Sequence, residues 1–324
     1  MTGHWTHSPK PIVILAPMDG YTDRAFRRLV KRIEPRIVLF TEFLSATELA
    51  KKPKLADDWM DIETQDQPLV VQLYGKDASD FKVAARLAED RGAAGIDLNM
   101  GCPARRIVAH QHGSALMKNI DLACELVAGV KSVVNIPVSV KTRLGWEHAD
   151  DLVPFGLKLE AAGLDAMTVH GRTYAQKFSG NADWTEIYEL KAALRIPVFG
   201  NGDVVDATSA QAMLGNLNGV MIGRAAVSDP YVLRAVAASL IDNIQLPQLQ
   251  AIDQLGDWRY FATEMVRMGT PDAMARRFRK FLIHLVTLAN RLDLRRDSTQ
   301  VTSLNQILTI IDRIEESSAV SAPV

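Results

Sequence analysis

The residues best suited to chemistry in this sequence stand just after short apolar runs. Cys102 follows one such run and lies between Gly101 and Pro103, with Asn99 shortly before it. A cysteine is most often a small buried core residue, and a redox pair needs a second cysteine nearby. Cys124 lies 22 residues further on, in a segment with helical periodicity, so we assign it to core packing. The polar loop around Cys102 favours a general acid or a nucleophile at that position.

Two other polar side chains stand inside apolar runs. Lys141 follows Val138 and Val140, and a lysine within a buried strand needs an anionic partner. Gln72 stands in an earlier run. A flavin ring has an amide-like edge with which a glutamine can pair, and a lysine near its N1–C2 edge stabilises the negative charge of the reduced form. Both residues therefore fit a flavin site, with a surface lysine as the alternative interpretation of Lys141.

Glycines and polar side chains at the ends of the last two runs predict a phosphate site. Glycine lets a backbone approach an anion closely, and arginine adds charge-assisted hydrogen bonds. Ordinary turn glycines are the alternative for either pair alone, but two pairs on adjacent strands favour the phosphate site. The residues concerned are Asn201, Gly202, Asp203, Gly223 and Arg224.

Eight short β-branched runs recur along the chain, each followed by a segment with helical periodicity. Runs that are apolar throughout are typical of parallel strands covered by helices on both faces. Eight strand-plus-helix units predict an α/β protein with a (β/α)8 barrel, in which the strand ends carry the active site. An open doubly wound sheet is the alternative, but the sequence lacks the Gly-x-Gly-x-x-Gly turn typical of one. The expected strands are residues 12–18, 38–43, 69–75, 95–101, 138–145, 166–172, 197–203 and 219–224.

The pattern changes near residue 246, after which helical periodicity replaces the strand-like runs. We expect helices over residues 257–268, 272–292 and 302–314. The middle helix combines an apolar stripe with basic side chains, namely Arg276, Arg277, Arg279 and Lys280. The sequence therefore predicts two domains, a barrel over residues 1–246 and a helical domain over residues 247–324.

Composition excludes several classes of protein. The 324 residues are 48% hydrophobic and 23% charged, with a formal net charge of −1, which argues against general disorder and against a uniformly basic nucleic-acid-binding protein. Two cysteines make no disulfide scaffold. The first apolar run, residues 12–16, is too short for a signal peptide, and no stretch approaches the roughly 18 apolar residues of a membrane span. We expect a soluble cytoplasmic protein with no membrane partner.

A metal site would need more ligands than the sequence brings together. His110 and His112 are separated by one residue, but two imidazoles and one thiol are too few without carboxylates at neighbouring strand ends. We therefore expect no metal, and we place the two histidines on a loop that faces the substrate.

Six strings, taken together and in order, resemble the tRNA-dihydrouridine synthases. They run through the whole barrel, and the helical C-terminal region agrees in size and position with that family. The strings are residues 16–27 (APMDGYTDRAFR), 72–75 (QLYG), 97–103 (DLNMGCP), 141–143 (KTR), 170–173 (HGRT) and 201–203 (NGD).

The resemblance implies an enzyme that holds FMN in the barrel and uses NADPH, or alternatively NADH, to reduce a D-loop uridine of tRNA to 5,6-dihydrouridine. It makes Cys102 the acid that protonates C5 of the uracil after hydride reaches C6, so the pKa of its thiol should not be depressed. The substrate would be held by Asn99, Arg143 and Arg172. The cofactor would be bordered by Pro17, Met18 and Asp19, with Gln72 and Lys141 on its polar edges and His170, Asn201, Gly202, Asp203, Gly223 and Arg224 at its phosphate end.

The resemblance also implies that the basic helical domain binds tRNA phosphates, in a protein that has no need to be more than a monomer. A buried flavin can reach a uracil only if the base leaves its stack, so loop uridines are the expected targets. This chain departs from the family at residues 107–112 (IVAHQH) and at Phe178, where some members have tyrosine. Two alternatives remain, a flavin-barrel enzyme that reduces a free pyrimidine and a non-catalytic RNA-binding protein that has kept the barrel.

Overall fold

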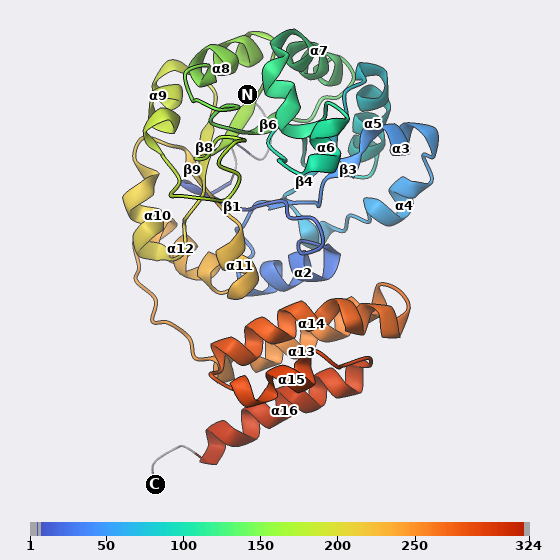
Figure 1. Ribbon diagram of the computed structural model, residues 1–324, viewed down its shortest axis with the longest axis vertical. Helices are drawn as coiled ribbons and strands as arrows, with labels where there is room; N and C mark the ends of the chain where they lie inside the picture. The colour runs from blue at the N-terminus through green and yellow to red at the C-terminus, as the bar shows by residue number, and fades with distance from the viewer. Residues whose placement is uncertain (1–4, 6–7, 321–324) are drawn as a thin grey trace.

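Eight parallel strands form a barrel in the computed structural model, which describes residue 5 and residues 8–320. Along the barrel the strands follow the order β1, β9, β8, β7, β6, β5, β4, β2, and a bridge between Ile14 and Val38 joins the two ends. The predicted (β/α)8 barrel is therefore confirmed (Figure 1). The strands are β1 (Ile12–Leu15), β2 (Leu39–Phe40), β4 (Leu69–Tyr74), β5 (Gly95–Asn99), β6 (Val138–Arg143), β7 (Ala166–His170), β8 (Val198–Asn201) and β9 (Gly219–Ile222), and a short β3 (Leu44–Ser45) pairs with β4.

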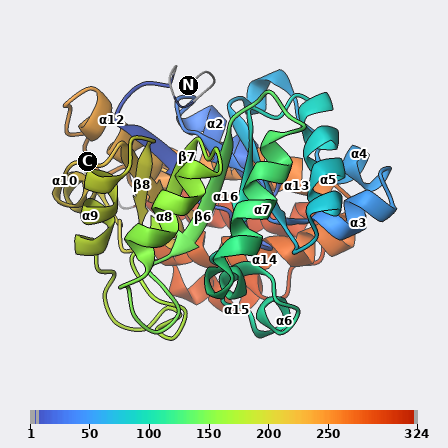
Figure 2. The ribbon, with the colours of Figure 1, turned by 90° about the horizontal axis from the view of Figure 1, so that it is seen from above.

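Helices surround this barrel (Figure 1), and the view from above shows several of them covering one side of its strands (Figure 2). Several begin at a polar cap: Asp77 accepts from Ser79 and Asp80 N–H at the start of α5, and Asp206 caps α10 in the same way. The helices of the barrel are α2 (Arg24–Ile33), α3 (Ala46–Lys51), α4 (Leu55–Trp59), α5 (Ala78–Asp90), α6 (Arg105–Ala109), α7 (Ile120–Lys131), α8 (Leu152–Ala161), α9 (Thr185–Ala193), α10 (Ala207–Leu214), α11 (Arg224–Ser228) and α12 (Val232–Ile241).

Alternation along the strands divides the barrel into an apolar floor and a polar top. On β1, Val13 and Leu15 belong to the large core between strands and helices, whereas Ile12 and Ile14 belong to a second cluster with Trp5. Successive side chains of a strand point to opposite faces, so this second cluster fills the barrel interior. Its members are Trp5, Ile12, Ile14, Ala16, Val38, Phe40, Val70, Ala166, Phe199 and Met221. Further along the same strands the inward positions become polar.

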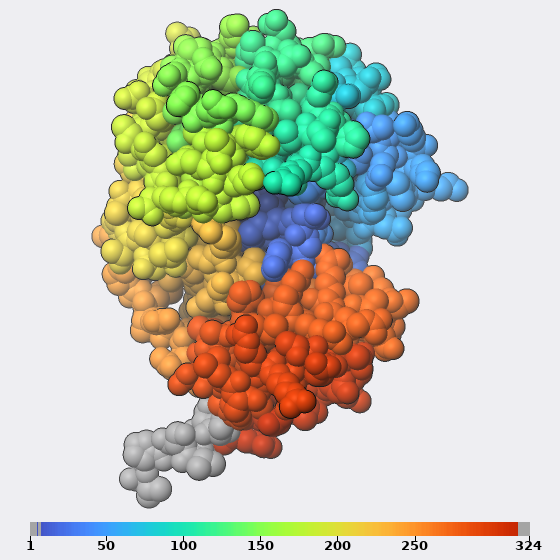
Figure 3. All heavy atoms as spheres, viewed as in Figure 1, coloured from blue at the N-terminus to red at the C-terminus, as the bar shows by residue number. Residues whose placement is uncertain are grey.

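A helical region follows the barrel and packs against it through α2 and α11 (Figures 1 and 3). Phe26 of α2 stacks on Phe281 with ring centroids 5.6 Å apart and meets Phe261 edge-on at the same distance. The predicted C-terminal helical region is thus confirmed. Within the described residues, no helix is both long and apolar enough to cross a membrane. The helices are α13 (Ala251–Arg267), α14 (Pro271–Leu288), α15 (Arg295–Ser298) and α16 (Leu304–Val320).

The basic stretch of α14 does not form the single RNA-facing surface that the sequence suggests. Arg276 is exposed, but Arg277 lies between Asp23 and Glu42 of the barrel, and Lys280 donates to a barrel carbonyl. Partners from the barrel therefore hold the charged groups of Arg277 and Lys280, and a role of these two residues in binding RNA stays a prediction.

Candidate active site

A cavity of about 940 Å³ opens at the carboxyl ends of the strands. Every site residue expected from the sequence lines it except Arg172. Aromatic side chains that the sequence reasoning did not assign, Tyr21, Phe43 and Phe178, complete its walls. The expected residues that the structure brings together are Pro17, Met18, Asp19, Gln72, Asn99, Cys102, Lys141, Arg143, His170, Asn201, Gly202, Asp203, Gly223 and Arg224.

Strand register explains why these residues converge. Asn99 of β5 is paired with Lys141 of β6, and Arg143 is paired with His170 of β7. His170 is in turn paired with Asn201 of β8. Because the barrel places paired residues side by side on its inner face, neighbouring strands contribute one continuous polar ring above the apolar floor.

A buried carboxylate that the sequence reasoning did not assign, Asp97, organises one side of this ring. It accepts from Gln72 Nε2 at 2.7 Å and from Ser139 Oγ at 2.7 Å, and none of its surface is exposed. Asn99 Nδ2 donates to Gln72 Oε1 at 2.9 Å, so the orientation of the Gln72 amide is fixed. Burial raises the pKa of Asp97 to about 6. Its position two residues before Asn99, on the same face of the strand, is the sequence signal that would have revealed it.

Cys102 is held by its backbone at the cavity wall. Its N–H donates to Asn99 Oδ1 at 2.9 Å, and its carbonyl accepts from Ser114 N–H at 3.1 Å. Gly113 has φ +59°, and a Cβ at that residue would lie 2.8 Å from the Cys102 carbonyl oxygen, so only glycine lets the loop close here. Burial raises the pKa of the Cys102 thiol, which keeps it protonated near neutral pH. The pKa is not depressed, in agreement with the requirement for an acid.

Lys141 brings a positive charge to the cavity. Its Nζ donates to Asn201 Oδ1 at 3.1 Å, and Asn201 Nδ2 donates to the Met221 carbonyl at 2.8 Å. Burial and the nearby Arg143 lower the pKa of Lys141 to about 8. Its hydrogen-bond partner is thus a neutral amide, while the nearest carboxylate, Asp97, is occupied by Gln72 and Ser139. An ammonium group in this setting suits an anionic edge of a bound molecule.

Arg143 ties the Cys102 loop to the loop that follows β7. Its Nε donates to the Gly101 carbonyl at 2.8 Å, and its Nη1 donates to the carbonyls of Thr173 and Lys177 at 3.1 and 2.7 Å. Burial lowers the pKa of Arg143 to about 10, so it stays charged at neutral pH. The guanidinium carbon lies 5.5 Å from the ring centroid of Phe178, whose side chain is 59% exposed at the mouth of the cavity.

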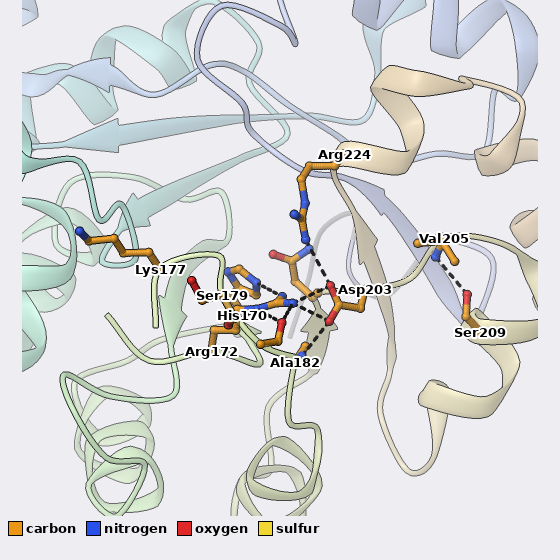
Figure 4. A network of polar contacts seen from close by, with 12 residues as sticks. His170, Arg172, Lys177, Ser179, Ala182, Asp203, Val205, Ser209 and Arg224 are labelled. Atoms are coloured by element: carbon orange, nitrogen blue, oxygen red, sulfur yellow. Dashed lines mark hydrogen bonds and ion pairs between the residues drawn. The ribbon is translucent and has the colours of Figure 1, made fainter. Parts of the chain in front are cut away.

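A second arginine, Arg172, points toward Asp203 (Figure 4) and does not line the cavity. Its side chain is 3% exposed and makes an ion pair of 2.7 Å with Asp203, while its other donors reach the carbonyls of Ser179 and Gly180. The expected contact of Arg172 with substrate does not fit this placement, because its donors are already bound to protein acceptors. Arg172 instead anchors the loop that carries Phe178.

The phosphate end of the predicted cofactor site contains the other arginine of this network (Figure 4). Arg224 is 63% exposed, and its Nη2 lies 3.2 Å from Asp203 Oδ1. Although burial acts against it, the hydrogen bonds from Ala182 N–H and Arg172 hold the pKa of Asp203 below its ordinary value. Burial and surrounding cations lower the pKa of His170 to about 2, so this imidazole is neutral. Asp203 therefore orients arginine here, while Arg224 is available to an anion.

His110 and His112 lie outside the cavity, on the connection that follows Cys102. His110 is exposed, and the ring of His112 lies 5.8 Å from that of Tyr74. In the part of the chain that the structure describes, no group of three or more His, Cys, Asp or Glu side chains is placed to hold a metal ion. The expectation that this connection faces the substrate stays a prediction.

Comparisons with known proteins show the family to which this chain belongs. The family model for dihydrouridine synthase (Dus) matches residues 14–319. A probable tRNA-dihydrouridine synthase of Rhodobacter capsulatus is 38% identical over 251 residues, which cover 76% of this chain and 77% of that protein. The tRNA-dihydrouridine synthase B of Xanthomonas campestris is 37% identical over 248 residues, covering 76% and 74%. The chain belongs to the dihydrouridine synthase family, and by that membership it is a flavin-dependent oxidoreductase of the tRNA-dihydrouridine synthase class.

Similarity among solved structures concerns the fold. A variant of NCR from Zymomonas mobilis superposes with a TM-score of 0.53 and 14% identity, covering 73% of this chain and 88% of that one. At this identity the likeness supports the barrel architecture alone.

Proposed function

We propose that this enzyme reduces the C5=C6 bond of a D-loop uridine in tRNA to 5,6-dihydrouridine, with FMN as its cofactor and NADPH as the reductant. The observation that carries this proposal is the Cys102 thiol, kept protonated and held by Asn99 in the same cavity as the Lys141 ammonium. A proton donor and a cationic group in one cavity are what a hydride transfer to a pyrimidine ring requires.

The residues around the cavity fit FMN. Lys141 offers a cation whose partner is a neutral amide, and Gln72 presents an amide whose orientation is fixed. Pro17, Met18 and Asp19 would border the ring, and Arg224 with the backbone of Gly202 and Gly223 would take the phosphate. We assign His170 and Asn201 to the same end. Asp203 would act through Arg224, since a carboxylate in direct contact with a phosphate is repelled.

A side chain of the protein, Cys102, protonates the substrate. When bound, FMN supplies a hydride to C6 of the uracil. The Cys102 thiol gives its proton to C5, so that one hydride and one proton saturate the double bond. The thiolate that remains lies near the positive charges of Arg143 and Lys141, which favour its formation, and it regains a proton from water. Cys102 is thus the general acid.

Asn99 and Arg143 would position the uracil. Asn99 already fixes the backbone that carries the thiol, because its Oδ1 accepts from Gly101 and Cys102 N–H at 3.2 and 2.9 Å. Arg143 joins the loop of Cys102 to the loop of Phe178. These contacts support a role in holding the reacting base against the thiol.

We further propose that residues 1–246 form the catalytic domain and residues 247–324 a tRNA-binding domain, in a monomeric cytoplasmic enzyme. The helical region reaches the barrel through α14 and α11, beside the cavity. Exposed basic residues of this region, such as Arg296, would meet tRNA phosphates. Binding should therefore weaken as salt is raised.

The proposal is tested by incubating the FMN-loaded enzyme with NADPH and an unmodified tRNA transcript. We expect nuclease digestion and mass spectrometry to find one D-loop uridine heavier by two hydrogens. Transcripts with that uridine replaced by cytidine should gain nothing. Reduction of free uridine at the rate of the transcript would contradict a tRNA substrate and favour a small-molecule reductase.

A further inference from the structure

The turn after β1 forms part of the cavity wall and ends at Gly20. Its residues Pro17, Met18 and Asp19 line the cavity, as does Tyr21 just after it. The turn is closed by hydrogen bonds from Tyr21 N–H to the Met18 carbonyl at 3.0 Å. Gly20 has φ +79°, a conformation that side chains rarely adopt, so the turn needs a glycine here.

Both polar backbone atoms of Gly20 are bound by charged side chains. Its N–H donates to Glu42 Oε1 at 2.5 Å. Its carbonyl accepts from Lys280 Nζ, which belongs to α14 of the helical region. The same ammonium lies 4.2 Å from the ring centroid of Tyr21. One residue of the helical region therefore contacts two consecutive residues of the cavity-side turn.

The carboxylate on the other side of Gly20 is also linked to α14. Arg277 Nη2 lies 3.3 Å from Glu42 Oε1 and 3.2 Å from Asp23 Oδ2. Asp23 is 3% exposed, and it caps α2 by accepting from Phe26 N–H. Lys280 and Arg277 are one turn apart on α14. Lys280 binds the Gly20 carbonyl directly, and Arg277 binds the Glu42 carboxylate that accepts the Gly20 N–H.

The helical region has other contacts that dock it on the barrel, so docking alone does not account for the bonds of Lys280 and Arg277. Docking already has the Phe26–Phe281 and Phe26–Phe261 ring contacts, and ion pairs between Arg28 and Glu264 at 3.4 Å and between Arg32 and Asp257 at 2.5 Å. Those pairs involve the body of α2 and lie away from the turn. At the turn itself, Lys280 of α14 donates to the Gly20 carbonyl, while Phe281 meets the ring of Tyr21 edge-on with centroids 5.9 Å apart.

We propose that Lys280 and Arg277 are positioning residues for the flavin site, which they serve by fixing the turn at Gly20. This inference rests on the proposed function only in taking the bound molecule to be FMN. The helical region then contributes to cofactor binding in the absence of tRNA. Removing the ammonium should release the Gly20 carbonyl and loosen the turn at Pro17, Met18 and Asp19, which weakens FMN binding without a direct contact being lost.

The experiment compares Lys280→Met with Arg276→Met. Methionine keeps the apolar stem of Lys280 and removes its donor, whereas Arg276 is exposed on the same helix and serves as the matched control. FMN affinity is measured by quenching of flavin fluorescence on the full-length protein stripped of flavin, without tRNA. We expect Lys280→Met to raise the Kd for FMN roughly five- to tenfold, Lys280→Arg to restore most of the affinity, and Arg276→Met to leave it unchanged.

A second variant tests whether the effect of Lys280→Met comes from the turn or from separation of the helical region from the barrel. Glu42→Gln keeps an acceptor for Gly20 N–H but removes the charge that holds Arg277, and it should weaken FMN binding by a smaller factor. Unchanged FMN affinity in both Lys280→Met and Glu42→Gln would overturn the inference. Failure of the wild-type protein to bind FMN would instead contradict the proposed function. Weaker tRNA binding by Lys280→Met, with FMN binding unaltered, would assign Lys280 to the RNA surface and would also overturn the inference.

Discussion

Asn99 Oδ1 accepts the backbone N–H of Cys102 at 2.9 Å, so the last residue of β5 fixes the residue whose thiol faces the cavity. The same amide donates to Gln72 Oε1, which is bound to the buried Asp97 by its Nε2. The proposed proton donor is thus connected through three hydrogen-bonded side chains to the interior of the barrel. A short rigid chain of this kind preorganises an acid without touching its thiol.

Replacing Asn99 should therefore slow the tRNA half-reaction and spare the other. In Asn99→Ala the Cys102 loop loses its acceptor, and a displaced thiol costs on the order of tenfold to a hundredfold in rate. Stopped-flow absorbance should show flavin reduction by NADPH within about twofold of wild type. Asn119→Ala, which removes the cap of α7 at a residue that does not line the cavity, is the matched control and should change neither rate. Equal slowing of both half-reactions would argue against this role.

The two arginines that share Asp203 should behave differently when each is removed. Arg172 is buried with all of its named partners in the protein, so Arg172→Ala should lower the free energy of unfolding by about 2–4 kcal/mol. Arg224 is 63% exposed, and Arg224→Ala should change stability by less than about 0.5 kcal/mol.

Arg224→Ala, which should barely change stability, should weaken FMN binding. Loss of a charge-assisted contact with phosphate should raise its Kd roughly tenfold, and riboflavin, which lacks the phosphate, should not distinguish Arg224→Ala from wild type. Chemical denaturation and fluorescence titration of the two variants measure both effects. A destabilisation of Arg224→Ala as large as that of Arg172→Ala would mean that Asp203 needs both partners to hold the loop.

Asp97 should make the folded state sensitive to pH between about 4 and 6. Its pKa is raised from 3.8 to about 6 by burial, so the folded protein binds a proton more tightly than the unfolded chain. The stability that this group adds is present below pH 3.8 and is lost as the pH rises through 6. Asp97→Asn keeps an acceptor for Gln72 and removes the titration.

The measurement for Asp97 is the difference in unfolding free energy between wild type and Asp97→Asn across pH 4 to 8. We expect the wild type to lose stability relative to the variant as the pH rises through this range, and the difference to level off above pH 7. A difference that stays constant from pH 4 to 7 would show that Asp97 titrates with an ordinary pKa.

The periodicity of apolar residues in the sequence predicts the strands better than it predicts their ends. Apolar runs indicate which segments are buried, so all eight strands were predictable, as was the convergence of residues at their ends. The residues at which the strands end were harder to predict. The run predicted as residues 12–18 ends as a strand at Leu15, because Pro17 lacks an N–H and Met18 N–H is bound by Thr22 Oγ1.

Partners distant in sequence were beyond prediction. Arg277 is bound by Glu42, 235 positions away, and Lys280 by Gly20, 260 positions away, so their basic character suggested RNA when their partners lie in the barrel. Arg172 was grouped with the substrate contacts for the same reason. A motif gives the type of residue and its strand, whereas the direction of a long side chain depends on acceptors supplied by the fold.

One anaerobic cuvette tests whether Cys102 is the acid for a flavin-mediated reduction of tRNA. Wild-type protein loaded with FMN should lose its flavin absorbance on adding NADPH and recover it on adding unmodified tRNA. Cys102→Ala should lose the absorbance equally fast but recover it roughly 10²- to 10⁴-fold more slowly. Recovery by Cys102→Ala at the wild-type rate would contradict the assignment of the acid, and absorbance that tRNA never restores in the wild type would contradict the reaction itself.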